Sequence, residues 1–359
     1  MALRVHERYL AREIYAATAL VLMAFLMLFA FFDLIHEFED IGKGNYQLQH
    51  AAAFVFLSVA GRIYELFPIA VLIGTLYALT LLGRHSEITV LRTSGLSTSS
   101  LLKTLAKLGA VFVVLTFVIG EFVAPPAERA AQQLRLKALS SMVAQEFRSG
   151  LWVKDEMSFV NVRDVLPDTR LRGVRIYEFD KDHQLHSISD AEEGEFQSPD
   201  QWRLIKVVQT VFDGDTARIT HMPDLIWHSA LTPDILSVLM VVPERMSIVN
   251  LFQYVRHLEE NQQLAQRYTI ALWKKLIYPL AALVMMALAL PFAYMQDRLG
   301  AVSLKVFAGI MLGITFHMLN GLFSSLGAIN KWTPFYSAIT PSAIFLLAAA
   351  GMIWWVERR

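Results

Sequence analysis

The residues of this sequence that could do chemistry are charged side chains set within long apolar runs. Asp33, Arg62, Glu65 and Lys274 each lie toward one end of such a run. A charge inside an apolar segment is costly and usually faces a cavity or a partner. Guanidinium and ammonium groups suit phosphate oxygens, so these cations could form a polar collar around lipid headgroups. Ion pairs within the chain, such as Arg62 with Glu65, are the alternative. The candidate headgroup contacts are Arg62, Arg135, Lys137 and Lys274.

Motifs that would support catalysis are absent from the sequence. It has no G-x-x-x-x-G-K-[ST] loop to cradle nucleotide phosphates and no G-x-S-x-G elbow. The run His257-Leu258-Glu259-Glu260 lacks the second histidine of a zinc-protease helix, so a solvated helix face is the better interpretation. There are no cysteines, which excludes disulfides, thiolate metal sites and cysteine nucleophiles. We therefore predict no catalytic residues, no metal site and no cofactor in this chain.

Six apolar runs must position the charged residues, and each is long enough to cross a bilayer as a helix of about 20 residues. Charged residues make up only 18% of the chain, against roughly 25% in soluble proteins. Basic and acidic residues are equal at 32 each, which gives no reason to expect a nucleic-acid partner. The third apolar run ends at Glu121 and Pro125-Pro126, and a helix that continues past these prolines would place Arg135 just above the bilayer. The predicted spanning helices cover 14–35, 63–82, 101–123, 270–294, 304–326 and 335–356.

The span 128–267 is too polar to cross a bilayer and is typical of a folded β domain. In 151–162, 171–179 and 202–212, apolar and polar residues alternate, and glycines and prolines separate these segments. An amphipathic helix over 247–266 is expected to lead into the fourth spanning helix. The predicted organisation is therefore helices one to three in 1–127, the β domain with its connecting helices in 128–267, and helices four to six in 268–359.

Basic residues in the short loops predict the orientation of the chain. With the N-terminus in the cytoplasm, the short outer loops hold little beyond Lys43 and Lys331. This bias is the one expected for cytoplasmic termini and an extracytoplasmic β domain. The basic residues on the cytoplasmic side are then Arg4, Arg8, Arg12, Arg84, Arg92, Lys103, Arg298, Lys305, Arg358 and Arg359.

The cytoplasmic loop 83–100 has the features of a short helix with both ends marked. Ser86 can cap its start, and Glu87 lies in the first turn, where a carboxylate suits the helix dipole. Gly95 is a natural residue just past the helix end, and Ser97 opens a second cap. A helix in such a loop suits docking into the groove of a separate motor protein. An ordinary helical loop is the alternative.

Short motifs follow one another along nearly the whole chain, and their order and spacing are more specific than any one of them. They are Glu7-Arg8-Tyr9, Gly42-x-Gly44-x-Tyr46, Phe67-Pro68, Arg84-His85-Ser86-Glu87 with Ser94-Gly95, Gly120-Glu121-x-Val123-Ala124-Pro125, Gly150-Leu151-Trp152-x-Lys154-Asp155, Leu231-Thr232-Pro233-Asp234 and Pro341-Ser342-Ala343. With these motifs the sequence resembles the LptF/LptG family of lipopolysaccharide export permeases, and its LptG branch most. The LptF branch is the alternative within the family.

The resemblance implies a polytopic α-helical membrane protein with six transmembrane helices and a periplasmic β-jellyroll domain between helices three and four. It implies a complex with LptF, an LptB dimer, LptC and, downstream, LptA. Lipopolysaccharide would be the substrate, and ATP and Mg would be bound by LptB. The coupling helix would lie near 84–95, with Arg84, Glu87, Leu91 and Arg92 as its candidate contact residues. A membrane-anchored sensor or scaffold is a rival outside the family, but the inner segments are too short to fold as a signalling domain.

The resemblance also places a lateral gate and a lipid path. Gly309-x-x-x-Gly313 permits a close helix approach, either to LptF or within this chain. His317 lies one turn further on and is expected in a helix–helix hydrogen bond rather than a proton relay. Asp33 stands where LptG proteins often carry lysines, so phosphate capture by helix one is not expected unless a cation bridges the carboxylates. The candidate acyl-chain path is Leu151, Val153, Phe159, Ile176 and Phe179.

Overall fold

The computed structural model describes residues 5–139, 151–155, 157–165, 170–180, 184–198, 201–213, 216–229, 242–294 and 301–358. Within them, six helical stretches are long and apolar enough to cross a membrane, which confirms the predicted number. Gly150 and residues 231–234 of the motifs, and the loop cations Arg4, Arg298 and Arg359, lie outside the described residues. The six stretches are Val5–Asp40, Leu48–Arg84, Thr98–Leu139, Gln266–Tyr294, Val302–Ile329 and Pro334–Val356.

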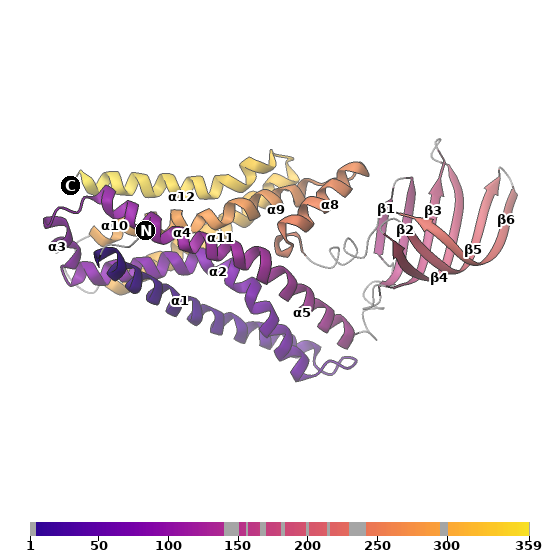
Figure 1. Cartoon of the computed structure of the whole chain (residues 1–359), viewed down its shortest axis with the longest axis horizontal. Coiled ribbons are helices and arrows are strands. Elements are labelled where there is room, and N and C mark those ends of the chain that lie inside the picture. The colour runs from indigo at the N-terminus through magenta and orange to yellow at the C-terminus, as the bar shows by residue number, and fades with distance from the viewer. Residues whose placement is uncertain are drawn as a thin grey trace.

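The helices form one bundle, and the strands form a separate sheet. Figure 1 shows α3, the first turns of α1 and the last turns of α12 at one end of the bundle, and the sheet beyond the opposite end. The first half of the bundle comprises α1 (Val5–Glu37), the short turn η1 (Phe38–Asp40), α2 (Leu48–Arg84), α3 (Glu87–Thr93) and α4 (Thr98–Val118). The second half comprises α9 (Gln266–Ile277), η4 (Tyr278–Leu280), α10 (Ala281–Tyr294), α11 (Ala301–Ile329) and α12 (Pro334–Glu357).

The third helix does not end at Pro125 and Pro126 but continues past them, as one case raised by the sequence requires. α4 continues through a π-helical turn, η2 (Ile119–Val123), into α5 (Ala124–Leu139). In this turn the N–H of Ala124 donates to the carbonyl of Ile119, five residues back. Proline lacks an N–H, and its ring crowds the carbonyl four residues earlier. The wider turn next to the prolines re-satisfies the neighbouring backbone groups, so the helix extends toward the β domain.

α2 is the central helix of the bundle. Of its most apolar 18 residues, 83% are buried, against 6% for α1. One core cluster joins α2 to α1, α4 and α10 and contains Phe67 and Leu105. A second joins α2 to α10, α11 and α12 and contains Leu72 and Phe316. The outer face of α1 is left to lipid or to another subunit.

The β domain is one antiparallel sheet of six described strands whose spatial order follows the sequence. The strands are β1 (Leu151–Asp155), β2 (Ser158–Val165), β3 (Leu171–Phe179), β4 (Leu185–Ser198), β5 (Gln201–Asp213) and β6 (Thr216–His228). Val160 pairs with both Val153 and Ile176 across the strands, so the three lie on one face. That face carries the core of the domain, which contains the fully buried Trp202.

A return segment connects the sheet to the fourth spanning helix. It contains the turn η3 (Pro243–Arg245) and α8 (Ile248–Glu260), which replaces the single long helix predicted over 247–266. Ser247 caps α8 by accepting the N–H of Asn250 at 3.2 Å. His257 is only 5% exposed, so the predicted solvated face is wrong at that residue. The Lys154 amino group donates to the Asn261 carbonyl at 3.2 Å, which joins β1 to the end of α8.

Candidate functional site

Arg62 of α2 is held by carboxylates from two helices. Its Nε and Nη2 donate to the two carboxylate oxygens of Asp33 on α1, at 3.0 and 2.7 Å. Its Nη1 donates to Glu65, one turn along α2, at 3.2 Å. A guanidinium group contacts a phosphate with the same two-pronged geometry. The ion pair with Glu65 considered from the sequence is therefore present, and Asp33 is an additional partner.

Arg245 of η3 extends this cluster toward the return segment. Its Nη1 donates to Glu128 of α5 at 2.7 Å, and its Nε lies 3.8 Å from Glu65. Glu128 is only 2% exposed. The resulting chain of charges ties α1, α2, α5 and η3 together. We call these five residues the arginine collar: Asp33, Arg62, Glu65, Glu128 and Arg245.

Arg135 of α5 lies in a separate cluster beyond the end of α1. It is ion-paired with Asp40 and lies 3.8 Å from Glu37, with its guanidinium 5.4 Å from the centre of the Phe54 ring. The Tyr46 hydroxyl donates to Glu37 at 2.6 Å, and burial together with that carboxylate raises the pKa of Tyr46. The acidic end of helix one therefore supplies partners for both candidate arginines. The other candidate on α5, Lys137, is exposed.

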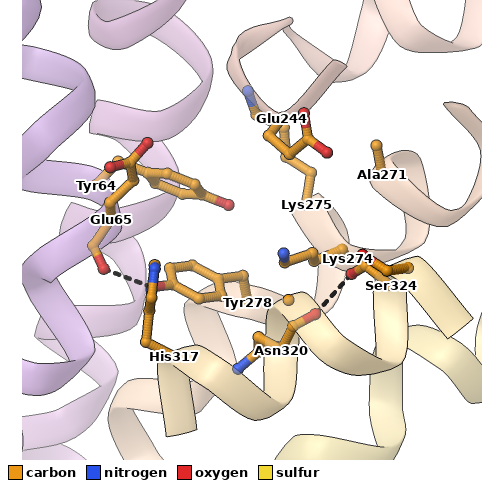
Figure 2. Close-up of a pocket in the computed structure, with 12 residues that line it drawn as sticks. Tyr64, Glu65, Glu244, Ala271, Lys274, Lys275, Tyr278, His317, Asn320 and Ser324 are labelled. Atoms are coloured by element: carbon orange, nitrogen blue, oxygen red, sulfur yellow. Dashed lines mark hydrogen bonds between the residues drawn. The ribbon is translucent and has the colours of Figure 1, made fainter. Parts of the chain in front are cut away.

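A cavity of about 320 Å³ opens between α2, α9 and α11, next to the arginine collar (Figure 2). The Tyr278 hydroxyl donates to the Glu65 carbonyl at 2.6 Å, which braces one wall. Lys274 and His317, which the sequence suggested for different roles, lie in this one cavity. We call it the lysine cavity, and its lining is Tyr64, Glu65, Glu244, Ala271, Lys274, Lys275, Tyr278, His317, Asn320, Gly321, Ser324 and Ser325.

The two lysines of the cavity differ in their partners. Lys275 is buried, its amino group donates to the Met246 carbonyl, and it lies 5.6 Å from the centre of the Tyr64 ring. Lys274 makes no ion pair and no hydrogen bond with any residue that the structure describes. Figure 2 shows its amino group directed into the cavity. Lys275 therefore fixes the return segment to α9, whereas Lys274 keeps its hydrogen-bonding capacity.

The loop after α2 folds as the sequence predicts in three respects. α3 is present, Gly95 has a φ of +96°, and Ser97 accepts the N–H of Ser100 at 3.2 Å. Ser86 differs from the predicted side-chain cap. Its φ is +62°, and its backbone carbonyl accepts the N–H of Val90. Ile88 is buried in the bundle core, whereas Val90 is 63% exposed. α3 is therefore anchored on one side and open on the other.

The four candidate coupling residues lie in or beside α3. Glu87 is its first residue, with the His85 ring 3.9 Å from its carboxylate. The others are Arg84, exposed at the end of α2, and Leu91 and Arg92, within α3.

Gly309 and Gly313 of α11 pack against α2 of the same chain. A Cβ at Gly313 would lie 2.6 Å from the Cγ2 of Ile69, and one at Gly309 would lie 3.1 Å from the Cδ1 of Leu76. The structure thus realises one of the two alternatives raised by the sequence, packing within the chain. His317 follows Gly313 by one turn of α11. The close packing of α11 on α2 therefore also positions this wall of the lysine cavity.

The candidate acyl-path residues do not share one face of the sheet, so their common inward placement is wrong. Phe159 precedes the inward Val160 and therefore points to the opposite face, where it is 44% exposed. The Phe179 ring lies 5.8 Å from the Phe159 ring, on that same outer face. The residues that do lie in or against the core are Leu151, Val153 and Ile176.

Comparison with known proteins agrees with this architecture. The family model described as lipopolysaccharide export system permease LptF/LptG matches residues 8–357. The chain belongs to this family. It is similar to the permease protein LptG of Haemophilus influenzae, with 31% identity over 354 residues, and to LptG of Escherichia coli K12, with 31% identity over 356 residues. Each alignment covers 98% of both chains. The protein is thus a multi-pass membrane permease subunit for lipopolysaccharide export, a non-catalytic component.

Several residues of these clusters escaped the sequence analysis. Arg245 and Glu244 precede the helix cap Ser247, and a charged pair beside a cap was the available signal. Glu37 lies one turn beyond Asp33, but nothing local identifies its tyrosine and arginine partners. Tyr64 and Tyr278 look like ordinary aromatic residues of spanning helices, and only the fold brings their rings within 5.0 Å.

Proposed function

We propose that the chain is the LptG-type permease subunit of an ABC exporter that extracts lipopolysaccharide from the inner membrane and passes it toward the outer membrane. The observation that carries this proposal is the similarity to LptG proteins over 98% of both chains. LptF is the second permease in the proposal, and an LptB dimer, which binds ATP and Mg, is the motor. LptC and LptA receive the lipid in turn.

The proposed orientation has cytoplasmic termini and a periplasmic β domain. The loop charges support it, and so does the position of α3 at the opposite end of the molecule from the sheet. Because the chain has no cysteine, single cysteines can report the two sides. In cells with a permeabilised outer membrane, an impermeant maleimide should label Lys206→Cys and leave Val90→Cys unlabelled until the inner membrane is opened. The reverse pattern would overturn the orientation.

In the proposal, force from LptB enters through α3. Its exposed side supports this role. Glu87→Ala should lower the lipid-stimulated ATPase rate of the assembled complex about tenfold, the effect of losing one charge-assisted hydrogen bond. Membrane abundance should not change. Glu259→Ala, an exposed carboxylate of α8, is the matched control. Full activity of the Glu87 variant would remove this residue from the coupling.

In the proposal, α1 and α11 open and close a lateral gate with LptF, and the headgroup passes close to the candidate cations. Asp33 acts in the gate by holding Arg62. Acyl chains follow the inward face of the sheet, past Leu151, Val153 and Ile176. A photo-crosslinker at Val153 should label lipopolysaccharide only when ATP is supplied, and one at Phe159 should serve as the outward-facing control. Labelling confined to Phe159 would contradict an inward path.

Co-purification tests the whole proposal and separates the two branches of the family. The full chain, extracted in a mild detergent, should carry with it an ABC ATPase and one second permease of the same family. If that second permease is itself an LptG, this chain is the LptF subunit. If no ATPase accompanies the chain under conditions that preserve other ABC exporters, the exporter proposal fails.

A further inference from the structure

The lysine cavity contains a cation that the chain does not neutralise by direct contact. Glu65 and Glu244 also line the cavity and attract Lys274 electrostatically. However, Glu65 is bonded to Arg62 at 3.2 Å and lies 3.8 Å from Arg245. Glu244 lies 3.8 Å from Arg267. Both carboxylates are therefore shared with arginines, and neither reaches the Lys274 amino group.

The rest of the lining suits an anion with several oxygens. His317 and Ser325 are exposed at the cavity, and Tyr64 contributes a phenol. These side chains can hydrogen-bond to oxygens, and of the two lysines in the cavity Lys274 is the one without a carbonyl or carboxylate partner among the described residues. The volume of about 320 Å³ lies at the small end of ligand pockets, which run from about 300 to 1,000 Å³. A compact, multiply oxygenated anion fits this chemistry better than an acyl chain or a cation.

We propose that the lysine cavity binds one phosphate group, with Lys274 as its ion-pairing residue and the cavity wall on α11 as its hydrogen-bonding side. This goes beyond the arginine collar, whose guanidinium groups already have carboxylate partners. The proposal rests on the proposed function in one respect: lipid export brings phosphate-bearing headgroups to this part of the bundle. A membrane phospholipid, a lipopolysaccharide phosphate and free phosphate share the chemistry, and the test separates them.

The test measures binding to the full-length chain in a neutral detergent, with three probes: inorganic phosphate, phosphatidic acid and a lipid A phosphate. Lys274→Met should weaken binding of the recognised probe about tenfold, as expected when one charge-assisted hydrogen bond is lost. Lys274→Arg should restore most of the affinity. Lys331→Met is the matched control, since Lys331 is an exposed lysine just beyond α11 and outside the cavity. Added salt should reduce the difference, because it screens exposed charges.

The probe that shows the tenfold loss identifies the source of the phosphate. Loss with inorganic phosphate indicates a site for the free anion, whereas loss with only one lipid assigns the site to that headgroup. If Lys274→Met binds all three probes as tightly as the Lys331→Met control, the proposal is overturned. Co-purification of the ATPase does not depend on Lys274, so failure of this proposal and failure of the exporter proposal are distinguishable.

Discussion

The arginine collar and the lysine cavity are neighbours that share Glu65, but they treat their cations in opposite ways. In the collar, Arg62 contacts Asp33 and Glu65, and Arg245 contacts Glu128 and the same Glu65. In the cavity, Lys274 contacts none among the described residues. A cation bound by carboxylates contributes to holding helices in place, and it must release a partner before it can bind a phosphate. A cation without a carboxylate partner can bind a phosphate directly.

This difference changes the expectation drawn from the sequence for helix one. From the sequence, phosphate capture by helix one was not expected unless a cation bridges its carboxylates. In the structure, Asp33 and Asp40 hold Arg62 and Arg135. Changes in the collar should therefore affect stability first, whereas changes at Lys274 should affect binding and leave stability nearly unaltered.

Glu128→Ala should give the largest loss of stability. It removes the closest partner of Arg245 from a site where the carboxylate is 2% exposed, and it leaves Glu65 at 3.8 Å as the remaining contact. Breaking a buried pair costs about 3 kcal/mol or more. Thermal unfolding of the detergent-solubilised chain measures this loss of stability. Lys274→Met is the comparison variant from the cavity, and its unfolding free energy should lie within about 0.5 kcal/mol of the parent value. Equal losses in the two variants would erase the distinction between the regions.

Asp33→Asn should cost less, about 2 kcal/mol, because Arg62 loses a bidentate partner but keeps Glu65. Adding Arg62→Met to this variant should recover part of the loss, since the guanidinium that lost its bidentate partner is then gone. A double-mutant cycle of unfolding free energies gives the coupling directly. Additive effects of the two substitutions would mean that the ion pair contributes nothing, and Arg62 would then be as ready for phosphate as Lys274.

The outlines of the fold could be predicted because they depend on local signals. Six apolar runs gave the six spans, and Gly95 and Ser97 gave the end of α3 and the start of α4. The π turn that carries the helix through Pro125 could not be predicted, because it leaves no clear mark in the sequence. Strand faces were assigned correctly where alternation is regular, but β3 has a register shift at Glu178–Phe179. The predicted inward placement of Phe159 was wrong because a large aromatic residue was assumed to point toward the core.

The site was less predictable, because its contacts join residues far apart in sequence. Arg62 was identified as a functional cation, but its partner Asp33 comes from another helix. Lys274 and Lys275 are adjacent and chemically identical, and only the fold gives one a carbonyl partner and leaves the other facing a cavity. Residue type therefore supplied the candidate side chains, whereas their state of pairing required three-dimensional neighbours.

Gly313→Ala should have a smaller effect and tests whether the cavity wall is rigid. The added Cβ would meet Ile69 at 2.6 Å, so α11 must shift or Ile69 must change its rotamer. Overpacking of this kind costs about 1–2 kcal/mol. Gly321→Ala is the control, because Gly321 also lines the cavity but a Cβ added there would have no neighbour within 4 Å. Phosphate affinity should fall in the first variant and not in the second. Unchanged affinity despite lost stability would show that the cavity does not depend on the α2–α11 approach.

The smallest effect is expected at His257, a third kind of polar site between the sheet and the bundle. His257 and Asp155 are both 5% exposed, and each has one side-chain atom, Nε2 and Oδ1 respectively, without a hydrogen-bond partner among the described residues. Burial lowers the pKa of His257, although the charges of Asp155 and Glu260 oppose this shift. This joint is thus more deeply buried than most of the collar, and it lacks the collar's ion pairs.

The lowered pKa of His257 determines how folding stability changes with pH. As the pH falls below about 6.5, the unfolded chain binds a proton at this histidine before the folded chain does, so folding stability decreases. Above that pH both states are neutral at His257, and the contribution is constant. Thermal unfolding at pH 7.5 and pH 5.5 should show a larger acid-induced loss in the parent chain than in His257→Gln, which cannot titrate. Because Lys154 joins β1 to Asn261, the loss should be accompanied by faster amide exchange over α8. An identical pH dependence in both chains would assign the acid sensitivity to other groups and leave His257 a packing residue.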